Sequence, residues 1–562
     1  MPFLSPHHFC SSLLAIAASS AWAQASPPAA QVIVVTGAVE SGALEQAPFA
    51  ASVIGRDTLE IAGPQIHLSE ALARVPGLLV SNRHNFAQDL QISSRGFGAR
   101  AGFGVRGMRL VADGIPASGP DGQGQVSHFD IAGAERVEVL RGPFSVLYGN
   151  ASGGVIALFT APVRDSRAEA GFDVGSFGLR QVRAAVEAPF QKTTTGGWFA
   201  RLGVQALRSE GFRPQSEARR ELASLRAGYA SEKDRITLRA THLSQPAQDP
   251  LGLTPAQFAA DPLQTTPQAL QFNTRKDTEH SQLGLSWRHR FSGTGLREFQ
   301  ASAFSGRRSV VQWLAIPPPT QAAPRHGGGV IDFDRDFGGV DSRLRFGLGA
   351  AQMVVGAAVE EQRDSRRGYA NFIGNQLGVT GALRRDETQT ARSRDVYAQG
   401  EWSFGPQGET GLLSAGVRHS NIRLAATDDY LSNGNDSGAR QFKATMPVLG
   451  LRWNVAPTWV LHASMGRGFE SPTLGELSYR PDGSGGFNTA LRGQKSNQFE
   501  VGARWRPATD VQFDAVVFDA RVEDEIAVAS NTGGRQSFRN VGRTTRRGAE
   551  LQAGWRPSAA WS

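Results

Sequence analysis

The chain contains 562 residues, of which 40% are hydrophobic and 65 are glycine, and it carries a formal net charge of +8. This composition is neither that of a coiled coil nor that of a disordered tail. No apolar run approaches the roughly 20 residues that a membrane helix requires, which excludes a helical membrane protein.

The N-terminus has the features of a secretory signal peptide. An apolar stretch from Leu13 to Ala23 ends in Ala21-Trp22-Ala23, the small-x-small pattern of a cleavage site. We predict a signal peptide over residues 1–23 and a mature chain from Gln24. Because the single cysteine, Cys10, precedes the apolar stretch, we expect no disulfide and no thiol chemistry in the mature protein.

The region from Val32 to Pro162 predicts a small α+β domain. It opens with a β-prone segment made of Val32, Ile33, Val34, Val35 and Thr36. A helix at Ser69–Arg74 is stopped by Pro76, and strands are predicted at Leu78–Ser81, Met108–Val111 and Arg136–Leu140. The last of these strands breaks at Arg141-Gly142-Pro143, so the residues at this break need an explanation.

From about Ala170 onward, apolar and polar residues alternate, as in strands with one face of each kind. In one such strand the apolar side comprises Val396, Ala398, Gly400, Trp402 and Phe404. The pattern recurs at Ile236–Ala240, Trp459–Met465, Phe499–Trp505, Val511–Val517 and Ala549–Trp555. A transmembrane β-barrel and a two-layer sandwich in water both fit this periodicity.

Turn lengths and tryptophan positions favour the barrel. Short links alternate with long connections such as Ser244–Glu279 and Arg308–Gly339, which places short turns at one rim and long loops at the other. Only Trp313 is expected in a long loop. The other mature tryptophans flank short turns, as in an aromatic girdle at one membrane interface: Trp198, Trp287, Trp402, Trp453, Trp459, Trp505, Trp555 and Trp561.

Several motifs resemble one known family in order and spacing. They are LSEALARVPGLLVSNRHNFAQDLQISSRGFGA, MRLVADGIP and RVEVLRGPFSVLYGNASGGVIALFT in the first domain, and RGFESPTLGELSYRPDGSGGFN and NVGRTTRRGAELQAGW in the strand-rich region. They resemble the plug and the barrel of TonB-dependent outer-membrane receptors. The resemblance implies a transmembrane antiparallel β-barrel of 22 strands with an α+β plug in its lumen. It also implies energised uptake of a scarce ligand, commonly a ferric siderophore.

The resemblance organises the chain into a signal peptide (1–23), a periplasmic extension (24–45), a plug (46–162) and a barrel (163–562). Val32, Ile33, Val34, Val35 and Thr36 resemble the TonB box, which adds as a strand to TonB, the partner that couples the receptor to the inner-membrane energising complex. Alternatively, this segment is an ordinary first strand of the plug. The resemblance places the protein in the outer membrane of a Gram-negative cell, in contact with lipopolysaccharide, and we expect a monomer.

The resemblance also gives the arginine at the break a role. In such receptors, plug arginines pair with glutamates of the barrel wall, which by motif here are Arg95 and Arg141 with Glu500 and Glu550. The alternation places both glutamates on the polar, inward face, and an arginine can donate two hydrogen bonds to one carboxylate. In the alternative interpretation, the four charges do not pair and each is solvated separately in the lumen.

Nearly all of the positive charge is arginine, which codon bias can explain. A basic lumen and basic loops favour an anionic ligand or lipopolysaccharide. We predict ligand contacts at the plug apices and at aromatic residues of the loops: Arg83, Phe86, Arg100, Phe103, Trp313, Tyr369, Tyr430 and Tyr479. A ferric siderophore or another metal chelate is the first expectation, with cobalamin, copper or a glycan as alternatives. A passive porin and a surface binding module are the rival functions.

No catalytic triad, resident metal site or cofactor motif is found, so we expect no enzyme, and an exported barrel is not expected to bind nucleic acid. About 16 or 17 strands can be counted after Pro162, fewer than the 22 of the family. We therefore expect a barrel truncated at its C-terminus, with an open edge whose unpaired backbone groups face lipid.

Overall fold

The structure is a computed structural model that describes residues 34–35, 42–43, 47–102, 104–191, 196–293, 295–483 and 486–557. The predicted signal peptide lies outside the described residues, as do Val32, Ile33, Thr36 and Trp561. The residues from Val34 onward form one compact unit. Within the described part of the chain, no helix has the length and apolar character needed to cross a membrane.

The N-terminal domain is built on a five-stranded sheet in the order β3-β8-β9-β6-β7. Its strands are β3 (Ala51–Gly55), β6 (Met108–Ala112), β7 (Ile115–Pro116), β8 (Ala134–Arg141) and β9 (Gly154–Thr160). Helices α1 (Arg56–Ile61) and α2 (Ser69–Leu72), the hairpin of β4 (Leu78–Ser81) and β5 (Gln91–Ser94), and a 3₁₀ turn, η2 (Pro143–Tyr148), complete it. Leu72, Leu110 and Ile156 are among the fully buried side chains of its core. The predicted α+β domain is confirmed, although its helix is two residues shorter than predicted.

A separate two-stranded element precedes this domain. Strand β1 (Val34–Val35) pairs antiparallel with β2 (Gly42–Ala43). Neither strand joins the five-stranded sheet.

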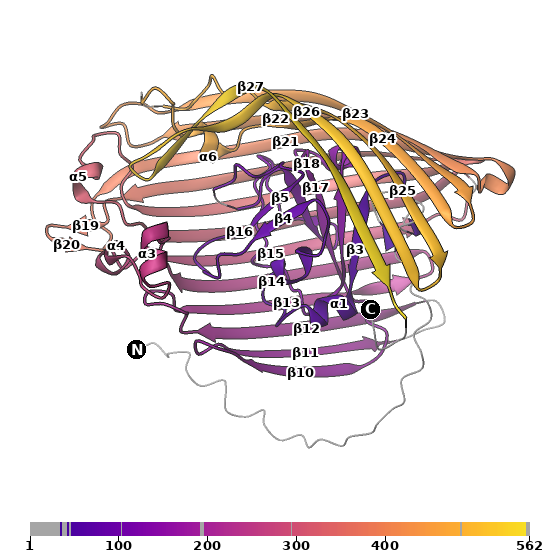
Figure 1. Cartoon of the computed structure of the whole chain (residues 1–562), viewed down its shortest axis with the longest axis horizontal. Helices are drawn as coiled ribbons and strands as arrows, with labels where there is room; N and C mark the ends of the chain where they lie inside the picture. The colour runs from indigo at the N-terminus through magenta and orange to yellow at the C-terminus, as the bar shows by residue number, and fades with distance from the viewer. Residues whose placement is uncertain are drawn as a thin grey trace, which may run out of the picture. The chain divides into compact units, whose positions relative to one another are not determined.

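The second domain is one antiparallel sheet in which 16 strands of the described chain follow one another in sequence order, as Figure 1 shows. The number of strands agrees with the count of 16 or 17. The strands are β10 (Arg167–Val174), β11 (Arg180–Phe190), β12 (Gly196–Ser209), β13 (Ala218–Ser231), β14 (Asp234–Gln248), β15 (Arg275–Arg290), β16 (Leu296–Trp313), β17 (Val330–Leu348), β18 (Ala351–Tyr369), β21 (Leu383–Phe404), β22 (Gly411–Asp428), β23 (Gly438–Ala456), β24 (Trp459–Glu470), β25 (Gln494–Ala508), β26 (Val511–Thr532) and β27 (Arg535–Trp555).

The loops of one rim carry the remaining short elements. These are α3 (Pro255–Ala260), α4 (Pro267–Gln271), α5 (Pro318–Gln321), β19 (Phe372–Ile373), β20 (Gln376–Leu377) and α6 (Leu474–Leu477). The other rim carries tight turns and the short 3₁₀ turn η3 (Pro406–Gly408). The predicted division into a long-loop rim and a short-turn rim is therefore present in the sheet.

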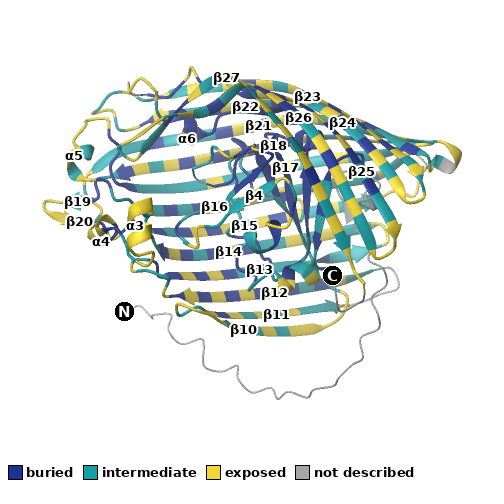
Figure 2. Ribbon diagram, in the orientation of Figure 1, coloured by how far each residue is buried: buried dark blue, intermediate teal, exposed yellow. Residues whose placement is uncertain are grey.

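Buried and exposed residues alternate along the strands, visible as bands in Figure 2, and the exposed face carries the apolar residues of the membrane band. On β25, Phe499 is 50% exposed while its neighbour Glu500 is fully buried. Trp198, Trp402 and Trp555 are also exposed. A sandwich in water buries its apolar faces, so this inverted pattern identifies the exposed face as the one that contacts lipid.

Two of the predicted long connections are wrong in length. The predicted loop Ser244–Glu279 is reduced to residues 249–274, and Arg308–Gly339 to 314–329, because the flanking strands continue further. Trp313, expected within a loop, is the last residue of β16. The outer parts of these strands carry charged residues on their outward face, such as Arg307 paired with Asp334 at 3.1 Å. Polar residues on both faces remove the alternation by which a strand is recognised.

The lipid-facing assignment predicts a position-dependent effect on β26. Val517, 56% exposed, lies in the apolar band, whereas Glu523 lies beyond it on the same strand and pairs with Arg543 at 3.6 Å. We expect Val517→Arg to lower the free energy of unfolding in lipid vesicles by about 2–4 kcal/mol. Glu523→Arg, the matched control, should cost less than about 1 kcal/mol because exposed ion pairs contribute little. Equal losses for the two variants would contradict the assignment.

Candidate functional site

Arg95, directly after β5, joins the N-terminal domain to the wall of the large sheet. Its Nη1 donates to Oε2 of Glu500 at 2.8 Å, and its Nε and Nη2 donate to the two carboxylate oxygens of Glu550 at 2.7 and 3.0 Å. The guanidinium also lies 4.4 Å from the centre of the Phe518 ring. Burial disfavours its charge, but the two carboxylates outweigh burial and raise the pKa of Arg95.

Arg141, at the end of β8, makes fewer contacts to the two glutamates than Arg95 does. Its Nη1 donates to the carbonyl oxygen of Pro76 at 2.9 Å, and its Nε lies 3.4 Å from Oε2 of Glu550. Burial and the positive charge of Arg95 lower the pKa of Arg141. The structure thus brings all four predicted residues together, with Arg95 rather than Arg141 making the paired hydrogen bonds.

Gly142 explains the glycine of the Arg-Gly-Pro break. Its φ of 75° lies in the left-handed region that favours glycine, and a Cβ there would collide with the Glu500 carboxylate. Gly77 also has a φ of 75°, and a Cβ there would collide with the Glu550 carboxylate. Pro143 then starts the 3₁₀ turn η2, where no backbone N–H is needed. The break is the point at which the domain approaches both glutamates closely.

The same domain contacts the wall at strands far from Arg95. Asp130 accepts from Arg201 on β12 at 3.1 Å, and Asp113 accepts from Arg239 on β14 at 2.5 Å. The contacts continue with Arg109 and Glu360 on β18 and with Arg418 on β22, which donates to the Leu147 carbonyl oxygen at 2.8 Å. The domain is therefore enclosed by the sheet and held to it mainly by charged groups.

An arginine-rich cavity of about 170 Å³ lies between this domain and the loops of the long-loop rim. Its floor is formed by Arg100, Gly102 and Arg106. Its walls come from α6 and from the outer ends of β17, β18, β21 and β27. Six guanidiniums line it: Arg100, Arg106, Arg366, Arg367, Arg385 and Arg535.

Three of these six arginines pair with carboxylates. Arg100 contacts Glu476 at 2.8 Å and Glu470 at 3.2 Å, Arg385 contacts Glu387, and Arg367 lies 3.6 Å from Asp386. Arg100 has a raised pKa because the two glutamates outweigh the effect of burial.

The other three arginines have no carboxylate partner among the described residues. Arg106 donates to the Ser471 carbonyl oxygen, Arg366 to Oγ of Ser478 at 3.1 Å, and Arg535 to the Tyr479 hydroxyl. Nε and Nη1 of Arg106 and Nε of Arg535 are buried without a hydrogen-bond acceptor. Burial and the charge of Arg100 lower the pKa of Arg106. The cavity consequently presents an excess of positive charge that an anionic ligand would neutralise.

Tyr479 stands in the wall of this cavity, two residues after α6. Thr473 caps the N-terminus of that helix: its side chain accepts from the backbone of Glu476, while the Glu476 side chain accepts from the backbone of Thr473. Arg385 and Arg535 both donate to the Tyr479 hydroxyl oxygen. Burial opposes ionisation of the phenol, but these guanidiniums outweigh it and lower the pKa of Tyr479 to about 8.

Of the eight predicted ligand contacts, Arg100 and Tyr479 line the cavity, and their contact with a ligand remains a prediction. Phe103 lies outside the described residues. The remaining five line other parts of the molecule: Arg83 contacts Gln88, the Phe86 ring lies tilted against that of His67, Trp313 lies under Arg275, and Tyr369 and Tyr430 contribute no side chain to the cavity. Sequence reasoning missed Arg366, Arg385 and Arg535, which the alternation of their strands places on the inward face.

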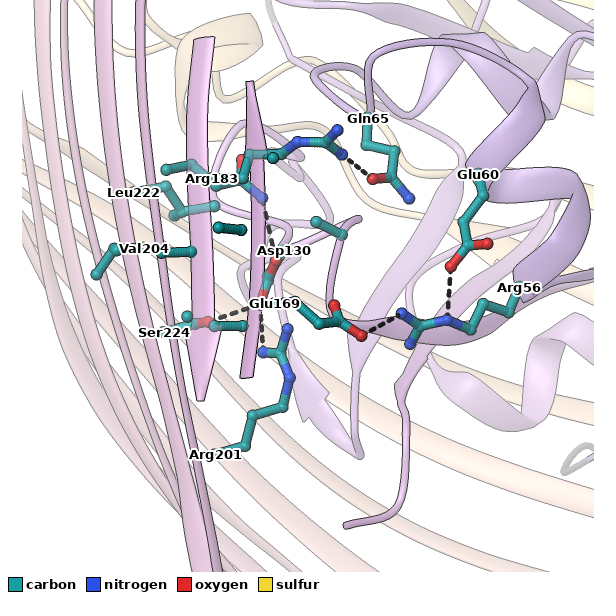
Figure 3. A pocket seen from close by; sticks show the side chains of 17 residues that line it. Arg56, Glu60, Gln65, Asp130, Glu169, Arg183, Arg201, Val204, Leu222 and Ser224 are labelled. Atoms are coloured by element: carbon teal, nitrogen blue, oxygen red, sulfur yellow. Dashed lines mark hydrogen bonds and ion pairs between the residues drawn. The ribbon is translucent and has the colours of Figure 1, made fainter. Parts of the chain in front are cut away.

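A second cavity, of about 240 Å³, lies between α1 and strands β10 to β13 (Figure 3). Its charges neutralise one another. Arg56 contacts Glu60 at 2.7 Å and Glu169 at 3.5 Å, and Asp130 accepts from Arg201 and, at 2.6 Å, from Ser224. It therefore lacks the excess of positive charge that distinguishes the arginine-rich cavity.

The geometry at Arg95 predicts the order of two substitutions. Arg95→Ala removes three charged hydrogen bonds, leaves the buried Glu500 without an ion pair and leaves Glu550 with only its longer contact to Arg141, so it should weaken docking of the N-terminal domain by about 3–5 kcal/mol. Arg141→Ala should cost about 1–3 kcal/mol, because one carbonyl hydrogen bond and one longer contact are lost. Hydrogen exchange of the β8 and β9 amides measures both, with the exposed Arg180→Ala as control. An Arg141→Ala effect as large as that of Arg95→Ala would refute the order.

Comparison with known proteins agrees with this architecture. The family model described as "TonB dependent receptor-like, beta-barrel" matches residues 223–562, and that of the "TonB-dependent Receptor Plug Domain" matches residues 43–155. An iron-regulated outer membrane virulence protein of Vibrio cholerae is 32% identical over 145 residues, which cover 25% of this chain and 22% of that protein. A hemin receptor of Yersinia enterocolitica is 32% identical over 139 residues, 24% of this chain and 19% of that protein. The chain thus spans about a fifth of the length of these relatives.

Solved structures share the fold at low sequence identity. The unliganded ferric citrate transporter FecA superposes with a TM-score of 0.72 at 18% identity, covering 91% of this chain and 75% of that one. The ferric yersiniabactin uptake receptor FyuA of Yersinia pestis gives 0.68 at 18% identity, covering 91% and 77%. Because the barrel model alone matches more than half of the chain, the protein belongs to the TonB-dependent receptors, an outer-membrane family of transporters and receptors rather than enzymes.

Proposed function

We propose that this receptor binds an anionic metal chelate, in the first instance a ferric one, and imports it into the periplasm with energy from TonB and its inner-membrane complex. The observation that supports this ligand class is the cavity above the plug, where Arg106, Arg366 and Arg535 have no carboxylate partner among the described residues. A chelate with carboxylate or similar oxygen groups supplies the missing counter-charges. Guanidinium groups suit such groups because they donate two parallel hydrogen bonds.

The names of similar proteins point in the same direction. Relatives and structural neighbours are named for ferric citrate, ferric yersiniabactin, iron regulation and hemin. One neighbour is named a copper transporter, so copper stays an alternative for this chain. A neutral glycan fits the cavity least well, because it would leave the buried guanidiniums without a counter-charge.

The rival functions differ from transport at two places in the molecule. A passive porin needs an open lumen, whereas here the plug is tied to the wall on β12, β14, β18, β22, β25 and β27. A surface binding module needs no strand for an energising partner. Val34 and Val35 lie in a two-stranded element outside the plug sheet, which favours their use as part of a TonB box rather than as a plug strand.

Ligand binding is tested by removing one unpaired guanidinium. Arg366→Gln takes away a charge that faces the cavity from β18. A hydrogen bond to a charged group contributes about 1.5–3 kcal/mol, so the affinity for ferric citrate should fall about 10-fold or more. Isothermal titration of the purified protein measures the affinity.

Arg363→Gln is the matched control for this experiment, since it makes the same change on the outward face of the same strand. Its affinity should equal that of the wild type. Equal affinity of Arg366→Gln and Arg363→Gln, or tight binding of a neutral sugar in place of the ferric chelate, would refute the proposed ligand class.

Energy coupling is tested at Val34. Strand addition uses backbone N–H groups, and proline has none, so Val34→Pro should abolish accumulation of labelled ferric citrate in cells while leaving binding unchanged. Val34→Ala keeps its N–H and should retain most of the uptake. Uptake by the proline variant equal to that of the wild type, at equal surface level, would show that Val32 to Thr36 is not a TonB box.

A further inference from the structure

Two arginines hold Tyr479 by its oxygen and by its ring. Arg385 and Arg535 donate to the hydroxyl oxygen, and their guanidinium carbons lie 4.9 and 4.8 Å from the centre of the tyrosine ring. The two arginines come from different strands, β21 and β27, and the tyrosine from the loop after α6. Three separate elements therefore converge on one phenol oxygen in the cavity wall.

This oxygen has capacity for one further bond. A neutral phenol oxygen has two lone pairs and one hydrogen, and the two guanidiniums occupy both lone pairs. No acceptor for the hydroxyl hydrogen is found among the described residues. When the proton leaves, a third lone pair becomes available while both arginines continue to donate. The surroundings thus stabilise the phenolate more than the phenol.

We propose that Tyr479 binds the metal ion of the cargo directly through its phenolate oxygen, so that the receptor selects chelates with an open coordination position. The inference rests on the proposed function, because it concerns the same cavity. A phenolate is a hard anionic donor, and tyrosine oxygen is an established ligand of iron. The unpaired Arg106 and Arg366 hold the acidic groups of the chelate, while Tyr479 contacts the metal.

The binding step balances without a redox change. A ferric chelate with an open position carries a water or a hydroxide there. The phenol O–H bond breaks and an oxygen–iron bond forms, while the displaced hydroxide takes the proton and leaves as water. Where water occupies the position, it leaves unchanged and the phenol proton passes to the solvent. Iron stays ferric throughout, and no further reactant is required.

A purely structural role for Tyr479 predicts a different outcome. In that case the phenol only fixes the positions of Arg385 and Arg535, and the metal ion keeps the ligands that its chelator provides. Chelates with complete and incomplete coordination spheres would then bind alike, and no bond to the protein would form.

The experiment uses ferric nitrilotriacetate, which leaves coordination positions open, and the purified full chain. A phenolate bound to ferric iron gives a visible charge-transfer band that gallium cannot give. We expect this band in the wild type, its loss in Tyr479→Phe, and its absence with gallium nitrilotriacetate. Ferric desferrioxamine, whose positions are all filled, has a visible band of its own, and its spectrum should not change when the protein is added. Tyr229→Phe, the same change on the distant strand β13, should keep the band.

Calorimetry on the same samples separates the two hypotheses. Binding of ferric nitrilotriacetate without a band, or a band that persists in Tyr479→Phe, overturns the inference and leaves the proposed function intact. Absence of saturable binding of both ferric nitrilotriacetate and ferric citrate overturns both. If Tyr479→Phe does not fold, resonance Raman spectra of the wild-type complex decide, because tyrosinate modes enhanced in the band support the bond and their absence refutes it.

Discussion

The plug has to be held by charge, because the lumen side of the sheet is its polar side. A strand that shows apolar residues to lipid presents mainly polar residues to the interior. Apolar contacts between plug and wall are accordingly small, such as Phe97 against Ala520 and Val522 of β26, and charged groups make the main attachments. Arg95, buried between Glu500 and Glu550, meets this constraint with three charged hydrogen bonds at a single point. The close approach that it requires accounts for the glycines at positions 77 and 142.

The same constraint shapes the cavity above the plug. Its lining includes six arginines beside a few apolar residues, and here the cationic groups outnumber their carboxylate partners. The Arg95 guanidinium donates only to carboxylates, whereas Arg106, Arg366 and Arg535 have no carboxylate partner among the described residues. The contrast distinguishes the cluster that attaches the plug from the cavity proposed to bind the ligand, although both are built from arginines and carboxylates.

Sequence reasoning succeeded where a pattern is local. The alternation around Phe499 and Glu500 predicted which residues face outward, and in β25 Phe499 is exposed and Glu500 is buried. The convergence at Tyr479 could not be predicted, because Arg385 and Arg535 are separated from it by 94 and 56 residues. Such contacts depend on the register between strands and on loop paths, neither of which periodicity encodes. The pairing at Arg95 was predicted only through motifs that fix which inward glutamates meet the plug.

The attachment of the plug at separate strands has a mechanical consequence. Asp113, Asp130 and Leu147 each contact a different strand of the wall, and Arg95 contacts two more. Each attachment is short-ranged, so a small displacement breaks it, and breaking one leaves the others in place. A force applied at one end of the plug would therefore open it stepwise along one side, at the cost of one attachment at a time, rather than expel it as a rigid body.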